Sequence, residues 1–382
     1  MHRVLIAGAG VGGLQAAHAL RKRLLPQDEI VVFDRDTVHT FWPSLLWLMT
    51  GTRRAEQVRR PLADLRERGI TVVSEPVAAF DPGRRTLTAG GREWTGDAVI
   101  LALGADLDPA QVPGLADEPG NFYTVAGAEA TWSALQTLDH GHVVVLISRV
   151  PFKCPAAPYE AAMLIDGYLR KRHRRERVDV SVWAAEPSPM GVAGPVVSQS
   201  VVDALRQHDV PYHPSQQVSR VDAAEHRLLF TDGTTVPYDL LAYVPPHRVP
   251  PVVVEAGLAP ADGWVSVDAR TLETPFANVF AIGDLVGIPL VVGKPLPKAG
   301  IFAHRQGEAV AQTVAHRLTG TGPVGLFDGQ GECFIEMGGG VAGFARGNFY
   351  AQPAPNVRTY RPGHHWHAAK VAFERHWWAQ WW

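Results

Sequence analysis

The sequence has few cysteines, little net charge and no long apolar run, and each of these absences excludes a class of protein. Two cysteines in 382 residues cannot form a disulfide framework, so they are either inert core thiols or a working pair. The balance of 36 Lys+Arg against 38 Asp+Glu gives no general attraction to nucleic acid. No uncharged stretch reaches the ~18 residues of a spanning helix, and no signal peptide is evident. We therefore expect a protein that is made in the cytoplasm without evident export and does not span a membrane.

A glycine-rich motif opens the chain. The run Gly8–Gly13 fits the pattern GxGxxG and lies between a predicted strand and a helix predicted over 14–24. Gly8 allows the turn, Gly10 admits a pyrophosphate, and Gly13 lets the helix pack on the strand. The next strand ends at Asp34, 21 positions after Gly13; an acid that bonds a ribose hydroxyl is expected at about 20. The motif predicts a dinucleotide-binding domain, and the alternative is a glycine-rich turn in an unrelated α/β fold.

A second unit repeats this plan without the glycines. A predicted strand at 142–148 leads into a helix at 156–169, and the junction between them, 150–155, contains no glycine. In a dinucleotide-binding domain such a junction holds a pyrophosphate on the backbone of a glycine loop. Here it holds Cys154, preceded by Lys153. The sequence thus predicts a nucleotide-binding scaffold that carries thiol chemistry.

Five further residues are candidates for contact with a flavin dinucleotide. An apolar strand ends at Gly104, where a glycine permits close approach, and Val77 opens a small meander. Another apolar strand ends at Gly283 and Asp284, whose carboxylate can bond a ribityl hydroxyl. Lys298 stands just before a helix whose positive N-terminus suits the N1/C2=O end of an isoalloxazine.

The predicted elements indicate an α/β fold of two Rossmann-like dinucleotide-binding domains with a small C-terminal α+β region. We expect residues 1–113 and 245–326 to form a discontinuous FAD-binding domain. Residues 114–244 then form the second domain, which carries the first cysteine. Residues 327–382 form the C-terminal region, which carries the second, Cys333. We assign no metal ligand.

Two surface segments have more than one interpretation. Of the 11 tryptophans, 5 follow Gly363, and a Trp-rich end with Lys and Arg suits a membrane-surface anchor. The alternatives are docking on the protein's own core and a contact in a homo-oligomer. The basic run 170–175 lies at a helix end, where cations favour the helix dipole, so we interpret it as a solvated terminus.

The chain resembles the sulfide:quinone oxidoreductases and the flavoprotein subunit of flavocytochrome c sulfide dehydrogenase, which share a glutathione-reductase-like fold. Gly8–Gly13 and Ala281–Asp284 mark only the wider flavoprotein group. The more specific motifs are Lys153–Glu160, Pro297–Gly300, Cys333-Phe334 and Lys370–Glu374. A third cysteine that many bacterial members carry is replaced here by Tyr123.

The resemblance implies a mechanism. Sulfide attacks a Cys154–Cys333 bridge, Cys154 keeps the sulfane sulfur, and Cys333 passes two electrons to untethered FAD and on to quinone. Lys153 and the helix start favour a thiolate at Cys154. Glu160 is a candidate acid or base, the alternative being a surface or helix-pairing glutamate. Lys370 is expected to reach the flavin pyrimidine ring.

Other functions remain open from the sequence. Cytochrome c could replace quinone as the electron acceptor, although a peripheral membrane protein suits quinone better. A type II NADH:quinone reductase would need a second glycine loop. A flavin-bound redox sensor without turnover would use the same fold as a scaffold.

Overall fold

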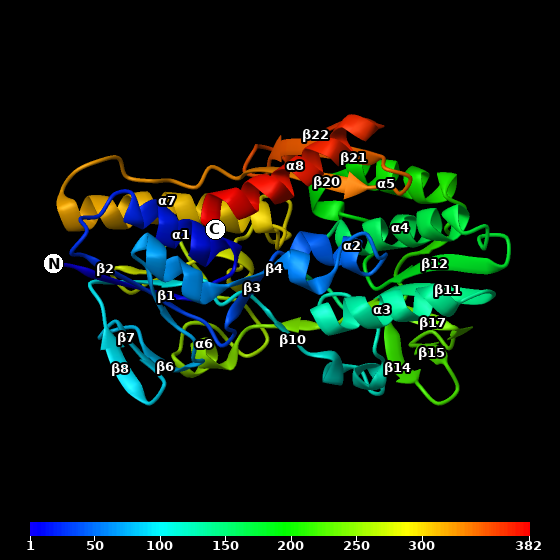
Figure 1. Cartoon of the computed structure of the whole chain (residues 1–382), viewed down its shortest axis with the longest axis horizontal. Helices are drawn as coiled ribbons and strands as arrows, with labels where there is room; N and C mark the ends of the chain where they lie inside the picture. The colour runs from blue at the N-terminus through cyan, green and yellow to red at the C-terminus, as the bar shows by residue number, and fades with distance from the viewer.

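The computed structural model describes residues 1–382. One half of the molecule, called the first half below, combines the start of the chain with residues 279–319 and is built on a parallel sheet. The elements are β1 (Arg3–Ala7), α1 (Val11–Arg21), β2 (Glu29–Phe33), β5 (Thr71–Val73), β9 (Ala98–Leu101), β19 (Val279–Ala281) and α7 (Gly300–Thr319). The strand order is β19-β9-β1-β2-β5, with α1 and α7 side by side against the sheet (Figure 1). The inner strands are continuous apolar runs, as expected where helices or loops cover both faces of a parallel sheet.

Smaller elements surround this sheet. They are β3 (Val38–Thr40), α2 (Leu45–Leu48), β4 (Arg59–Pro61), β6 (Val77–Asp81), β7 (Thr86–Ala89), β8 (Arg92–Thr95) and α6 (Pro251–Glu255). β6, β7 and β8 form the predicted antiparallel meander, and β3 pairs with β4.

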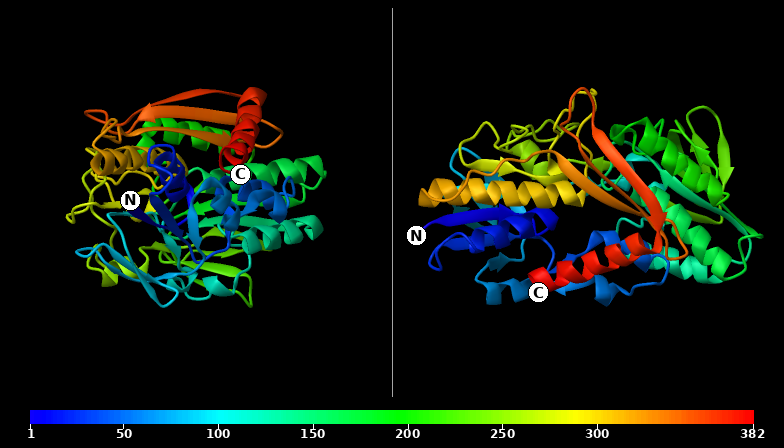
Figure 2. Two further views of the ribbon diagram at one scale, coloured as in Figure 1. Left: turned by 60° about the vertical axis from the view of Figure 1, so that its left-hand side comes forward. Right: turned by 90° about the horizontal axis from the view of Figure 1, so that it is seen from above.

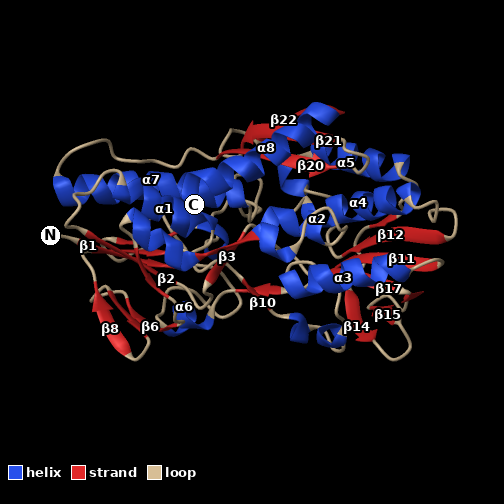
Figure 3. Ribbon diagram, in the orientation of Figure 1, coloured by secondary structure: helices blue, strands red, loops and turns tan.

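The second half repeats the plan. Its elements are α3 (Val125–Thr137), β11 (Gly141–Ile147), α4 (Ala157–Lys171), β12 (Val178–Ala184), α5 (Pro195–Gln207), β13 (Tyr212–His213), β14 (Val218–Asp222), β15 (Arg227–Phe230), β16 (Thr235–Pro237) and β17 (Leu240–Val244). The parallel order is β13-β12-β11-β17, beside a β14-β15-β16 meander. Figure 3 shows helices flanking both parallel sheets. β10 (Asp106–Leu107) pairs antiparallel with β18 (His247–Arg248), so the two segments that cross between the halves are hydrogen-bonded to each other. The predicted fold class is confirmed.

The C-terminal region lies against both halves. An antiparallel sheet of β20 (Gln330–Glu336), β21 (Ala342–Asn348) and β22 (Asn356–Gly363) is followed by α8 (His364–Trp381). β20 contacts α7 of the first half and α4 of the second, and Figure 2 shows this region spanning the two. Trp377 and Trp381 are buried, against His39 and His18 respectively. These two tryptophans therefore pack on the protein's own core, one of the alternatives weighed above. No helix combines the length and apolarity that crossing a bilayer requires.

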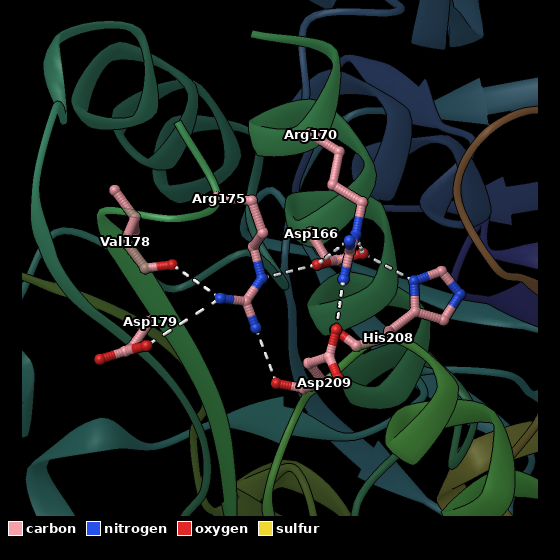
Figure 4. A network of polar contacts seen from close by, with 7 residues as sticks. All are labelled: Asp166, Arg170, Arg175, Val178, Asp179, His208 and Asp209. Atoms are coloured by element: carbon pink, nitrogen blue, oxygen red, sulfur yellow. Dashed lines mark hydrogen bonds and ion pairs between the residues drawn. The ribbon is translucent and has the colours of Figure 1, made fainter. Parts of the chain in front are cut away.

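The basic run at the end of α4 is not simply a solvated terminus. Asp166 is fully buried and accepts hydrogen bonds from Arg170, Arg175 and His208 (Figure 4). Arg170 also pairs with Asp209, so the network ties the end of α4 to the end of α5. Arg170, Lys171, Arg172 and His173 are exposed, as a solvated terminus predicts. Arg175 is largely buried instead, because its partner, Asp166, lies inside the domain.

Candidate functional site

The loop between β11 and α4 holds Cys154 in a defined backbone geometry. Cys154 has φ +53°, the left-handed region that non-glycine residues rarely adopt and that is often found at functional sites. Its N–H donates to the Lys298 carbonyl over 2.6 Å. The Tyr123 hydroxyl donates to the carbonyl oxygens of Lys153 at 2.8 Å and of Cys154 at 3.3 Å. Tyr123 thus fixes the loop that carries the first cysteine.

One apolar cavity brings the two cysteines together. Cys154 comes from the β11–α4 loop and Cys333 from β20, 179 positions later, and both line a cavity of about 390 Å³. Both are free thiols, and the Cys333 thiol contacts the Phe334 carbonyl at 3.2 Å. The cavity wall is otherwise mainly apolar and includes Met190, Val192, Ile301, Phe302 and Phe349. The predicted partners therefore face a common space that a small sulfur compound can enter.

The electrostatics of Cys154 differ from the prediction. Burial raises its pKa to about 12, and the nearby carboxylate of Glu160 adds to the effect, while Lys370 opposes it. The ammonium group of Lys153 lies 4.7 Å from the centre of the Trp42 ring, and its interaction with a Cys154 thiolate is weaker than the effect of burial. Burial likewise raises the pKa of Cys333 well above its usual value. The N–H of Ala157 at the helix start lowers the pKa of Cys154, as expected, but withdrawal of the thiol from water outweighs this effect and that of the local cations.

Glu160 and Lys370 form a buried ion pair beside the cysteines. Lys370 Nζ donates to Glu160 Oε1 at 2.7 Å, and the same oxygen accepts the backbone N–H of Glu336 at 2.7 Å. The ammonium group of Lys370 also lies 5.3 Å from the centre of the Trp47 ring. Glu160 is only 3% exposed, so it is not a surface glutamate. It joins α4 to β20 and α8, which places a carboxylate within electrostatic reach of both thiols.

The glycine motif leaves room for a ligand on one side only. A Cβ on Gly8, where φ is +106°, would lie 2.3 Å from the Ala102 carbonyl oxygen, and one on Gly13 would lie 1.9 Å from that of Gly8. Gly10 and Gly104, by contrast, meet open space. Helix α1 begins at Val11 with no side-chain cap, three residues earlier than predicted. Its free N–H groups suit a pyrophosphate.

Two acids complete this cradle. Asp34 Oδ2 accepts the N–H of Ala9 at 2.7 Å, which holds the acid against the glycine loop. Asp284 Oδ1 is buried with no partner, and burial raises the pKa of this carboxyl against the opposing charges of Lys153 and Lys298. A buried acceptor without a donor is costly, so a bound group with a hydroxyl donor would satisfy it.

Lys298 and Val77 have different surroundings. Lys298 Nζ donates to the carbonyl oxygens of Asp284 at 2.7 Å and Val286 at 3.2 Å, and burial lowers its pKa to about 8. Its ammonium group lies 3.4 Å from the centre of the Trp264 ring. Helix α7 begins two residues later with an uncapped N-terminus. Val77 opens β6, where it is paired with Ala89, and its contact with a cofactor stays a prediction.

These features fit a flavin dinucleotide. The open side of the glycine loop suits the pyrophosphate, Asp34 the ribose, and the unpartnered Asp284 Oδ1 a ribityl hydroxyl. The uncapped start of α7 suits the end of the flavin ring that gains negative charge on reduction. The residues present therefore agree with the cofactor that the sequence predicts.

The sequence interpretation missed one acid on the cavity. Glu186 follows β12, lines the cavity, and accepts a hydrogen bond from the Tyr159 hydroxyl. Burial raises its pKa to about 7. An acid just after an apolar strand of a dinucleotide-binding unit was a usable signal, since that position often contacts a ligand.

Comparison with known proteins agrees with this architecture. The family model described as pyridine nucleotide-disulphide oxidoreductase matches residues 2–307. A mitochondrial sulfide:quinone oxidoreductase of Mus musculus is 26% identical over 92% of this chain and 79% of its own length. A sulfide-quinone reductase of Aquifex aeolicus is 27% identical over 98% of this chain and 89% of its own. The crystal structure of the Aquifex aeolicus sulfide:quinone oxidoreductase has a TM-score of 0.89 and 25% identity, and the match covers 100% of this chain and 91% of that one.

Proposed function

Because this chain belongs to the pyridine nucleotide-disulphide oxidoreductase family, we propose that it oxidises sulfide and passes the electrons through FAD to a quinone. The observation that carries the proposal is the meeting of Cys154 and Cys333 on one apolar cavity. The activity named in two relatives and in one solved structure supports it. The chain is an oxidoreductase, and its relatives imply a flavin cofactor.

The proposed reaction begins with the two cysteines joined as a disulfide. HS⁻ attacks the sulfur of Cys154, so a new S–S bond forms, the Cys154–Cys333 bond breaks, and Cys333 leaves as a thiolate. Glu160 takes the remaining proton of the sulfide. Closure of a Cys154–S–Cys333 bridge, from the persulfide sulfur and the Cys333 thiolate, then yields two electrons, which FAD would accept when bound. Sulfide has lost one proton and two electrons, and the quinone gains two electrons and two protons, of which solvent supplies the second.

The chain's residues have separate roles in this scheme. Tyr123 fixes the loop of Cys154, and the apolar wall of the cavity excludes water from the sulfur–sulfur exchange. FAD, when bound, supplies the two-electron relay from the thiols to the quinone. We propose that it is held without a covalent bond, since both cysteines are used in the sulfur chemistry.

Membrane contact is part of the proposal, but through a different surface from the one that the sequence predicted. Trp377 and Trp381 are buried, so these two tryptophans of α8 are poor candidates for an anchor. Trp42 and Phe373 are exposed apolar side chains, and Phe41, next to Trp42, contacts Phe373. A surface patch around these residues would allow a hydrophobic quinone to arrive from a bilayer.

Anaerobic titration of the purified flavoprotein tests the proposal. Sulfide alone should bleach the flavin absorbance, and a short-chain quinone should restore it faster than cytochrome c does. Bleaching by NADH alone would place the chain with the NADH:quinone reductases. A flavin that sulfide never reduces would favour a redox sensor.

A further inference from the structure

The cavity that holds the cysteines has one charged side chain without a partner. Its wall carries four charged residues, which are Glu186, Lys294, Lys298 and Glu332. Glu186 accepts a hydrogen bond from the Tyr159 hydroxyl, and Lys298 donates to two carbonyl oxygens. Glu332 pairs with Arg305 over 3.0 Å. Lys294 alone is left without a hydrogen bond or ion pair from its side chain, so its charge is free to act on a ligand.

A short hairpin places Lys294 at the mouth of the cavity. Pro289 and Pro295 form an antiparallel bridge, and the Leu290 N–H donates to the Lys294 carbonyl oxygen at 2.9 Å. Lys294 is exposed and yet lines the cavity, so its ammonium group lies where solvent meets the apolar wall. A cation in this position raises the local concentration of anions at the entrance.

A second donor lies beside this ammonium group, above a bare glycine. A Cβ on Gly191 would lie 2.8 Å from Ser188 Oγ and 3.3 Å from Lys294 Nζ. The hydroxyl comes from the second half of the molecule and the ammonium from the first, and both converge on the space over Gly191. All three residues line the cavity. Two donors with room between them suit a small anion, and a side chain at position 191 would occupy that room.

We propose that Lys294 and Ser188 form an entrance site that selects anionic sulfur species, HS⁻ and the anionic ends of short polysulfides, over neutral hydrogen sulfide. This inference rests on the proposed function, in which HS⁻ attacks the disulfide. The ammonium and hydroxyl groups bind the anion, which then passes along the wall to Cys154, and no covalent bond changes at the entrance. Without a cation the apolar wall would disfavour the anion, since a charge withdrawn from water is costly unless it is paired.

The acids of the wall do not cancel the charge of Lys294. Burial raises the pKa of Glu186 to about 7, against the opposing charge of Lys294, which forms no ion pair with it. Below this pH the Glu186 carboxyl group is therefore mostly protonated. Glu332 is held by Arg305, and Arg346 lies 4.0 Å from it as well. The entrance therefore keeps the positive charge of its lysine.

Thiol alkylation tests the entrance without turnover. Iodoacetate is an anion and iodoacetamide is its neutral counterpart, so the ratio of their rates with the reduced protein measures charge selection and cancels any change in thiol reactivity. Lys294→Gln should lower this ratio at least about fivefold at low ionic strength. Gly191→Ala should lower it with the lysine in place, because the new methyl group fills the space between the donors. Lys22→Gln, at an exposed position outside the cavity, should leave it unchanged.

Sulfide kinetics give a second readout at the same entrance. In the wild type the second-order rate constant for flavin reduction should fall as salt is added, since ions screen the attraction. Lys294→Gln should lower this constant and flatten its salt dependence, while the limiting rate at saturating sulfide stays at the wild-type value. A lysine with a purely structural role would not give this combination.

The outcomes separate the entrance site from the proposed function. Wild-type alkylation ratios in Lys294→Gln and Gly191→Ala, or an unchanged salt dependence in Lys294→Gln, would overturn the entrance site and leave the proposed function standing. A wild-type flavin that sulfide does not reduce would overturn the proposed function, and with it sulfide as the ligand of this site. The alkylation ratio does not depend on sulfide, so the two failures are distinguishable.

Discussion

Lys370 and Glu160, 210 positions apart, form a buried ion pair with an Nζ–Oε1 distance of 2.7 Å. The pair fastens α8 to α4 beside both thiols. Removing one partner leaves a buried charge, which typically costs 3–5 kcal/mol. Lys370→Met should therefore lower the free energy of unfolding by about 3 kcal/mol, and the double variant Glu160→Gln/Lys370→Met should recover much of it. Denaturant unfolding of the wild type, Lys370→Met, Glu160→Gln and the double variant measures the coupling; equal losses in Lys370→Met and the double variant would contradict it.

The cysteine pair gives the most direct test of the chemistry. Cys154→Ser and Cys333→Ser should each abolish flavin reduction by sulfide, because neither can form the bridge that sulfide attacks. Both should keep the flavin spectrum and its reduction by dithionite, which needs no thiol. Rapid-mixing absorbance under anaerobic conditions measures both reactions. Full sulfide activity in the two variants would refute the mechanism.

Much of this fold could be predicted from the sequence because its signals are local. The run Gly8–Gly13, the acid at Asp34 and the apolar strands identify a dinucleotide-binding plan from neighbouring residues. The start of α1 at Val11 was missed because Gly12 and Gly13 are poor helix formers. In the structure both lie in the first turn of the helix, where Gly13 packs closely on the Gly8 carbonyl.

The site was less predictable because its properties depend on distant residues. Burial of Cys154 sets its pKa, and no neighbour in sequence reveals that burial. The Trp-rich end of the chain has the composition of a membrane anchor. Trp377 and Trp381 nevertheless pack on the core, against His39 and His18 respectively.

Asp284 should control the affinity for the flavin. Its Oδ1 atom is buried without a partner, so a cofactor hydroxyl would gain a hydrogen bond to a charged group, worth about 1.5–3 kcal/mol. Asp284→Asn should weaken FAD binding by roughly tenfold or more on this scale. Asp262→Asn, at an exposed position, is the control. Flavin fluorescence quenching during reconstitution measures both affinities, and equal values would remove Asp284 from the cofactor site.

Glu186 should make the stability depend on pH. Burial raises its pKa from 4.5 to about 7, so the folded state binds a proton more tightly than the unfolded chain does. This contribution is present below pH 4.5 and is lost as the pH rises through 7, an effect of up to about 3 kcal/mol. Glu186→Gln should flatten the decline in the melting temperature between pH 5 and 8. A decline of wild-type size in the variant would assign it to other groups.

Asp166 should be a main support of the second domain. Its carboxylate is fully buried and holds Arg170, Arg175 and His208, so Asp166→Asn leaves these cations without their common partner (Figure 4). The expected loss is about 3–5 kcal/mol in the free energy of unfolding. Asp209→Asn is a matched control, since it removes a carboxylate from the same network that is 78% exposed and should cost about 1 kcal/mol or less. Urea unfolding of both variants gives the comparison. Similar losses in the two variants would mean that the burial of Asp166 does not decide how strongly the two helix ends are joined.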